Sequence, residues 1–168
     1  MRGRCDRTGP CVNLGFEREG PMAEHANERI RIDASIEECQ TVVLDFESYP
    51  SWARDLKQVT IQERDADGRG ALVEFRAAAM GQSFRYTLRY DYTPMPESFS
   101  WVLETGEKIR QLDGTYRFES DGDATRVHYD LVVDLSIPMP GLIKRRAAGM
   151  IMGTALRELK KAVESRSK

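Results

Sequence analysis

The chain has 168 residues, of which 40% are hydrophobic and 31% charged, a balance typical of one globular domain with a sizeable core. A formal net charge of −2 provides no overall attraction for nucleic acid or for an anionic membrane, so we expect no nucleic-acid partner. No run of about 18 apolar residues occurs, and we therefore expect no transmembrane segment.

The cysteines indicate a reducing compartment. There are three, Cys5, Cys11 and Cys39, and their odd number and spacing fit neither a disulfide framework nor a zinc site. The arginines near the N-terminus are not followed by the apolar segment of a secretory signal. We expect a cytoplasmic protein with no metal and no cofactor.

The N-terminal part of the chain lacks a structural period. Residues 1–28 contain scattered glycine, proline and charge, with no repeat of 2 or 3.6 residues. We interpret residues 1–28 as a disordered tail and residues 29–166 as the folded domain. Met22 stands just before the patterned sequence, which leaves open whether residues 1–21 belong to the native protein.

The folded part begins with a strand and two short helices. Residues 29–32 alternate between charged and apolar side chains and predict a strand. Ser35 followed by Glu38 is a capping box, which predicts the start of a helix. That helix should end before Pro50, and Trp52 should lie in a second short helical turn.

A series of strands follows. Residues 84–92 alternate most regularly between apolar and polar side chains. Further alternation predicts strands around residues 59–61, 71–75, 98–105, 112–118 and 127–135. Since short turns join these consecutive segments, we expect an antiparallel meander.

The last segment is helical. Between about residues 141 and 165, apolar residues recur at spacings of three and four. At ~1.5 Å per residue this helix is roughly 36 Å long, which is enough to cross a whole sheet.

Three motifs resemble one known family. Residues 45–52 (DFESYPSW), residues 112–118 (LDGTYRF) and the Pro-Met-Pro turn at 138–140 with the helix after it carry the resemblance. They are similar to segments of the polyketide cyclase/dehydrase and lipid-transport group of START-like (SRPBCC) proteins, closest to small actinobacterial members. The resemblance implies an α+β helix-grip fold, like that of birch-pollen allergens. In it, a curved antiparallel sheet of about six or seven strands wraps a long C-terminal helix, with two short helices after the first strand.

The resemblance also implies a cavity between the sheet and the final helix, and the residues agree with it. The middle of the last helix is rich in alanine and glycine, while the strands opposite carry bulky aromatics. This contrast fits either close helix packing or a space for a hydrophobic ligand. The candidate ligand-binding residues are Trp52, Phe75, Tyr86, Leu88, Tyr90, Trp101, Leu103, Leu112, Tyr116, Met150, Met152, Gly153 and Leu156.

Signals for catalysis are poor. His25 lies in the expected tail, and strand alternation puts His128 on the outer sheet face. Two such histidines cannot build a Ser-His-Asp, Cys-His or H-E-x-x-H site. Cys39 is expected to pack as a small hydrophobe. Tyr116 is the one weak catalytic candidate, so the sequence favours a binding protein over an enzyme.

Three functions stay open. The first is binding or transport of a lipid, an isoprenoid quinone or a polyketide-like compound by a monomer or homodimer. The second is a polyketide cyclase/dehydrase, and the third is an interaction module of the ribosome-associated START-like type. The basic residues 144–146 either form a solvated face or make transient contact with a membrane or an acidic partner.

Overall fold

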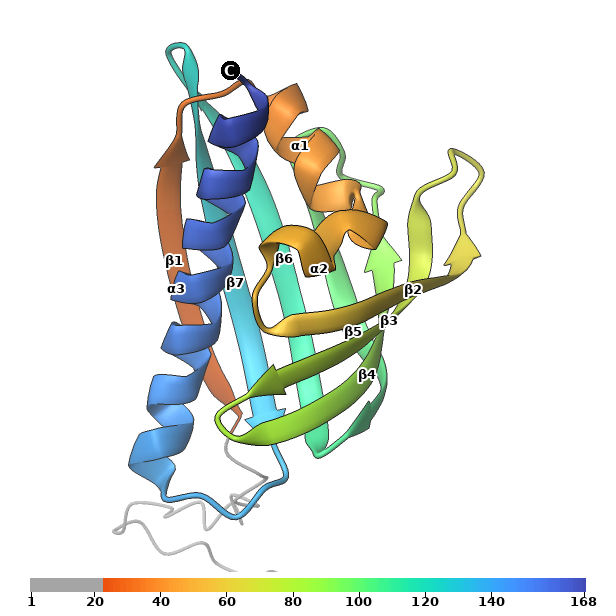
Figure 1. Ribbon diagram of the computed structural model, residues 1–168, viewed down its shortest axis with the longest axis vertical. Helices are drawn as coiled ribbons and strands as arrows, with labels where there is room; N and C mark the ends of the chain where they lie inside the picture. The colour runs from red at the N-terminus through yellow and green to blue at the C-terminus, as the bar shows by residue number, and fades with distance from the viewer. Residues whose placement is uncertain (1–22) are drawn as a thin grey trace, which may run out of the picture.

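The computed structural model describes residues 23–168, which form one antiparallel sheet and three α-helices (Figure 1). The strands are β1 (Glu24–Ile32), β2 (Leu56–Arg64), β3 (Gly70–Ala79), β4 (Gln82–Asp91), β5 (Ser98–Glu107), β6 (Ile109–Asp121) and β7 (Ala124–Leu135). The helices are α1 (Ile36–Leu44), α2 (Tyr49–Trp52) and α3 (Gly141–Arg166), with a 3₁₀ turn (Phe46–Ser48) before α2. The α+β helix-grip architecture expected from the sequence is confirmed.

The first strand starts earlier than the sequence pattern suggested. β1 pairs with β7 in antiparallel register from Glu24 opposite Val133 to Ile32 opposite Thr125. Residues 24–28, which we expected in a tail, are therefore part of the sheet. Their side chains are mostly polar, so no hydrophobic alternation marked them, and β7 supplies the backbone partners. Residues 1–22 of the expected tail, including Cys5, Cys11 and Met22, lie outside the described residues.

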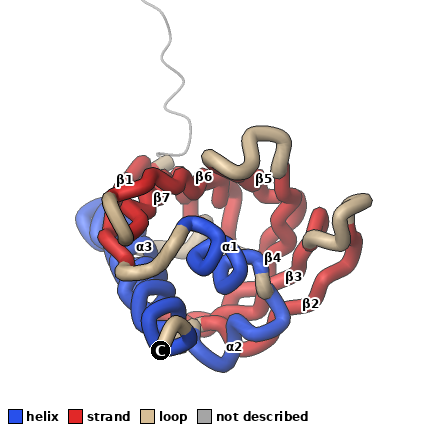
Figure 2. The backbone as a smooth tube through the Cα atoms, turned by 90° about the horizontal axis from the view of Figure 1, so that it is seen from above, coloured by secondary structure: helices blue, strands red, loops and turns tan. Residues whose placement is uncertain are grey.

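The sheet is a strongly curved meander of β2 to β7, with β1 added at one edge beside β7. The strand order is β1-β7-β6-β5-β4-β3-β2. Between β5 and β6 the ladder covers only Ser98–Trp101 against Arg117–Gly114. Beyond it, the carboxylate of Asp113 accepts the backbone N–H of Leu103 at 2.9 Å, which replaces a strand-to-strand bond. Seen from above, the sheet curls around the helices and leaves a concave inner face (Figure 2).

The first helix begins where the capping box predicted. Ser35 Oγ accepts the backbone N–H of Glu38 at 3.1 Å, and Glu38 Oε2 accepts the backbone N–H of Ser35 at 2.7 Å. Pro50 lies in the first turn of α2, where it needs no backbone donor. These two helices and the 3₁₀ turn cover one end of the concave face.

Helix α3 lies along the β1 edge of the sheet and does not cross its middle. It packs chiefly against β1 and β7 (Figure 1). Met152, Leu156 and Leu159 are buried there, and Lys160 Nζ donates to the backbone oxygen of Arg31 at 2.7 Å. The inner face of β3 to β5 is therefore left without a helix over its centre. No helix within residues 23–168 is both long and apolar enough to span a bilayer.

Candidate functional site

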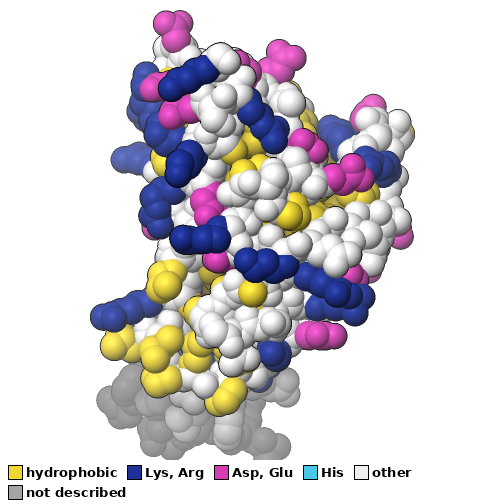
Figure 3. Space-filling view, in the orientation of Figure 1, with side chains coloured by type: hydrophobic (Ala, Val, Ile, Leu, Met, Phe, Trp, Pro, Cys, Tyr) yellow, Lys and Arg dark blue, Asp and Glu magenta, His cyan; other side chains and the backbone are white. Residues whose placement is uncertain are grey.

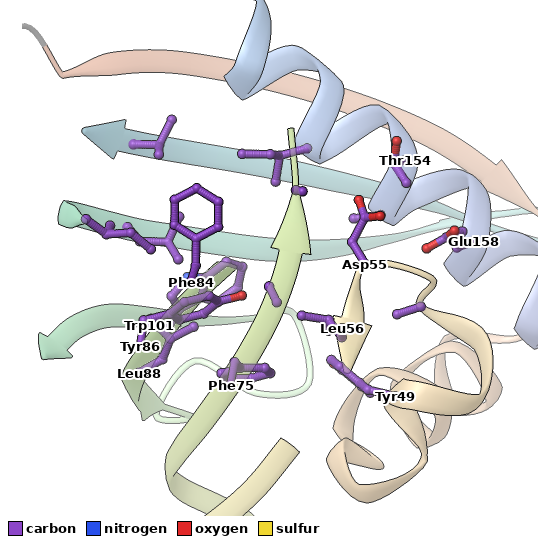
Figure 4. Close-up of a pocket in the computed structure, with 18 of the residues that line it drawn as sticks. Tyr49, Asp55, Leu56, Phe75, Phe84, Tyr86, Leu88, Trp101, Thr154 and Glu158 are labelled. Carbon is purple, nitrogen blue, oxygen red and sulfur yellow. The ribbon is translucent and has the colours of Figure 1, made fainter. Parts of the chain in front are cut away.

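A cavity opens between α3, α2 and the concave face of the sheet. Its volume is about 180 Å³, whereas on the same scale one buried water needs only about 10–15 Å³. Its lining comes from two helices and the sheet: Tyr49 and Trp52 of α2, the inner side chains of β3 to β7, and one stripe of α3 (Figure 4). The space is thus large enough for a small organic molecule.

The cavity wall is largely aromatic. Phe75 stacks on Tyr86 with ring centroids 5.3 Å apart, and Tyr116 stacks on Tyr129 at 4.6 Å. Strand alternation creates this surface, because every second residue of adjacent strands faces the same side. Flat, rigid rings of this kind offer stacking surfaces to a ring-bearing ligand.

The tyrosine hydroxyls divide into two groups. The hydroxyl of Tyr49 donates to the backbone oxygen of Val43, and the hydroxyl of Tyr92 donates to the backbone oxygen of Gly70 at 2.6 Å. The other four make no hydrogen bond to any residue of the described chain, and they are not among its fully enclosed unpaired polar atoms. They therefore keep accessible surface, and all four residues line the cavity: Tyr86, Tyr90, Tyr116 and Tyr129.

Two indole groups in the lining are also without partners. Trp52 Nε1 and Trp101 Nε1 are enclosed and have no acceptor within residues 23–168. Trp101 is only 5% exposed, and its ring lies directly over Gly114. Buried donors without partners are rare in folded proteins and call for an explanation.

The open side of the cavity carries carboxylates. Asp55, in the connection just before β2, and Thr154 and Glu158 of α3 are partly exposed and lie on the same side of the cavity (Figure 4). Glu158 Oε1 lies 3.8 Å from Arg54 Nε, and Glu158 Oε2 accepts the backbone N–H of Arg54 at 3.1 Å. Asp55 has no ion pair with any residue that the structure describes. Of the two carboxylates at the rim, only that of Asp55 is therefore unpaired within residues 23–168.

Burial keeps the tyrosines neutral. Burial raises the pKa of all six tyrosines above the ordinary value of about 10. The six are Tyr49, Tyr86, Tyr90, Tyr92, Tyr116 and Tyr129. A folded-state pKa above the unfolded value contributes stability that is fully present below about pH 10 and is lost as the pH rises further.

We therefore expect alkaline titration to unfold the protein cooperatively. Tyrosinate absorbance should stay absent through the pH at which free tyrosine ionises and then appear in one step. Circular dichroism, recorded in parallel, should change in that same step. Gradual tyrosinate formation in a protein whose circular dichroism is unchanged would contradict the burial of these phenols.

The structure brings eight predicted residues together and leaves five outside. Trp52, Phe75, Tyr86, Leu88, Tyr90, Trp101, Leu112 and Tyr116 line the cavity. Leu103, Met150, Met152, Gly153 and Leu156 do not. The four α3 residues among these five were assigned to the wrong face of the helix. Met150 is 60% exposed, while Met152 and Leu156 are buried away from the cavity.

The α3 stripe that does face the cavity consists of Ile151, Thr154, Ala155 and Glu158. Its spacing of three and four residues is present in the sequence, but so is that of the neighbouring stripe, and only the docking of α3 on β1 selects between them. Most of the small residues of α3 do not line the cavity. Gly153 is buried against β1, where a Cβ would lie 3.0 Å from Arg157 Nη1 and at an ordinary contact distance of 3.4 Å from Glu28 Oε2.

The list of candidate ligand-binding residues also left out Tyr49, Asp55 and Tyr129. Tyr49 belongs to the segment 45–52 that carried the family resemblance, and Tyr129 shares the alternation of β7, so both had a signal. Asp55 had none, because it lies in the short connection between α2 and β2.

The residues considered for catalysis lie away from the cavity. His128 faces outward, as predicted, with Nε2 3.0 Å from Glu119 Oε2, while His25 belongs to β1. Cys39 is fully buried in the core, and burial raises the pKa of its thiol to about 11. No group of three or more potential metal ligands occurs within residues 23–168. Tyr116 alone among these candidates reaches the cavity.

A curved antiparallel sheet that holds a long C-terminal helix beside an aromatic cavity defines a helix-grip protein of the START-like class. The family model described as polyketide cyclase / dehydrase and lipid transport matches residues 23–164. The chain belongs to this family. No curated protein matches it.

Solved structures show the same fold. A START superfamily protein from Mycobacterium smegmatis is 26% identical, with a TM-score of 0.78 over 84% of this chain and 97% of its own. The Zhui aromatase/cyclase from Streptomyces sp. R1128 is 15% identical, with a TM-score of 0.71 over 88% of this chain and 97% of its own. Ginseng major latex-like protein 151 from Panax ginseng is 9% identical, with a TM-score of 0.65 over 83% and 97%.

Proposed function

We propose that this protein binds and carries a small hydrophobic molecule with a ring system in the cavity beside α3. The observation that supports this most is the set of four cavity tyrosines whose hydroxyls have no partner among the described residues. A solid core would either bond such groups or replace them with phenylalanine. Lipids with rings, isoprenoid quinones and polyketide-like compounds share the required mixture of apolar surface and oxygen.

A binding assay with a neutral fluorescent probe tests the proposal. N-phenyl-1-naphthylamine fluoresces weakly in water and strongly in apolar surroundings. We expect a saturable rise in its fluorescence with one probe bound per chain. Native mass spectrometry of gently purified protein adds a second readout, namely the mass of a co-purified hydrophobic compound. Absence of saturable binding together with a ligand-free mass would overturn the proposal.

A cyclase or dehydrase activity is the second candidate, and Tyr116 supports it. Its hydroxyl reaches the cavity, and burial raises its pKa, so the phenol stays protonated and could donate a proton to a bound carbonyl. The lining within the described chain contains no histidine or lysine as a base, which is why we place this candidate second. If the activity exists, Tyr116→Phe should abolish turnover of an offered polyketide, although the variant still binds that compound.

The third candidate, a protein-interaction module, is supported by a different surface. Leu142, Ile143 and Met150 on α3 are exposed, and Lys144 to Arg146 lie beside them. Figure 3 shows apolar side chains gathered at this end of the molecule. We rank this candidate below ligand binding because nothing in the described chain specifies what would cover this surface.

A further inference from the structure

The cavity offers free hydroxyl groups to a ligand. The phenols of Tyr86, Tyr90, Tyr116 and Tyr129 line it, keep accessible surface and have no partner among the described residues. The unpaired indole N–H groups of Trp52 and Trp101 are enclosed, so a ligand in the cavity does not reach them. Because burial keeps the four phenols protonated, each can donate a hydrogen bond to a carbonyl or ether oxygen of a ligand.

The charges of the lining favour a neutral ligand. The described residues around the cavity include no Lys, Arg or His, and their only ionisable groups other than the tyrosines are the carboxylates of Asp55 and Glu158. The guanidinium groups of Arg54 and Arg157 are exposed and lie outside the lining. An anionic ligand would lose its hydration without gaining a cation from the lining, and it would also meet the unpaired carboxylate of Asp55 at the rim.

Resting on the proposed function, we infer that this cavity selects neutral ring compounds that carry carbonyl or ether oxygens and rejects carboxylates and sulfonates. Asp55 and Glu158 are the residues that determine the rejection of anionic ligands. Fatty acids and other anionic amphiphiles are then poor ligands, although the same cavity would hold their uncharged counterparts.

Three matched competitors test the inference by displacing N-phenyl-1-naphthylamine from the protein. Fluorene has the ring system alone, 9-fluorenone adds one carbonyl, and 9-fluorenone-2-carboxylate adds a negative charge to that. We expect fluorenone to displace the probe several-fold more tightly than fluorene. Fluorenone-2-carboxylate should be at least about tenfold weaker than fluorenone. Its methyl ester, which has nearly the same size but no charge, should recover most of the loss.

Charge-removing variants separate the rim from the rest of the surface. Asp55→Asn removes a carboxylate that has no ion pair with the described residues, and Asp55→Asn with Glu158→Gln removes both. We expect the preference for ester over acid to fall by about threefold or more in the double variant. The control is Asp123→Asn with Glu119→Gln, which alters net charge equally at the exposed β6–β7 hairpin and should leave the preference unchanged.

The outcomes distinguish this inference from the proposed function. If the probe binds but acid and ester compete equally, the charge selection is wrong and the ligand-binding function stands. If fluorene competes as well as fluorenone, the free phenols do not bind the ligand's oxygen, and the part of the inference that concerns carbonyl and ether oxygens is wrong. If no probe binds at all, both are overturned.

Discussion

Replacing Ala155 with phenylalanine should abolish ligand binding without unfolding the protein. Ala155 lies in the middle of the α3 stripe that faces the cavity, and its side chain leaves space that a phenyl ring would fill. Because the added ring enters an existing void, its burial should leave stability unchanged or slightly raised. We expect the affinity for N-phenyl-1-naphthylamine to fall by about tenfold or more, measured by fluorescence titration with a thermal melt of the same sample.

The control for this variant places the same ring elsewhere on α3. Lys161→Phe adds a phenyl group to an exposed position of the helix, and probe binding should stay at the wild-type level. The comparison also excludes binding at the exposed apolar residues Leu142, Ile143 and Met150, which Ala155→Phe does not touch. Full binding by Ala155→Phe would show that the probe occupies that outer surface or another site.

Replacing Gly114 with alanine should produce the largest loss of stability of any single-methyl addition to the sheet. A Cβ at Gly114 would lie 2.2 Å from Trp101 Cζ2 and 2.7 Å from Trp101 Cε2. The indole cannot yield easily, since Phe99, Tyr116 and Tyr129 surround it at centroid distances of 6.2, 5.4 and 5.6 Å. We expect the free energy of unfolding to drop by about 3 kcal/mol, at the upper end of overpacking effects, as measured by urea denaturation.

A second glycine supplies the matched control. A Cβ at Gly149 would meet no atom within 4 Å, and the residue lies inside α3. Gly149→Ala should therefore raise the free energy of unfolding by about 1 kcal/mol, because alanine has the higher helix propensity. A loss from Gly114→Ala no larger than about 0.5 kcal/mol would mean that the indole does not lie over this glycine.

The fold was predictable because several local signals agreed. Residues 84–92 alternate regularly, Ser35 and Glu38 form a capping box, and the last 26-residue helix has a clear apolar period. The strand pattern also identified much of the cavity wall, since alternation assigns every second residue to the same face. Phe75, Tyr86 and Trp101 were found in this way and line the cavity.

What the sequence could not specify is how the elements dock. The helical period of α3 contains two adjacent stripes, one with Met152 and Leu156 and the other with Ile151 and Ala155. The packing of α3 on β1 decides which stripe is buried. The sequence pattern predicted only the second half of β1, because residues 24–28 are largely polar. The place of Asp55 in the cavity lining could not be predicted for a related reason. Asp55 lies in a connection, which has no period that would predict where its side chain lies.

The measurement that tests ligand binding in the cavity most directly is a map of nuclear Overhauser contacts between bound N-phenyl-1-naphthylamine and the protein. The account predicts contacts from the probe to the methyl groups of Ala155 and Leu88 and to the rings of Tyr86 and Tyr116. Contacts confined to the exposed side chains of Leu142, Ile143 and Met150, with none to Ala155, would contradict it.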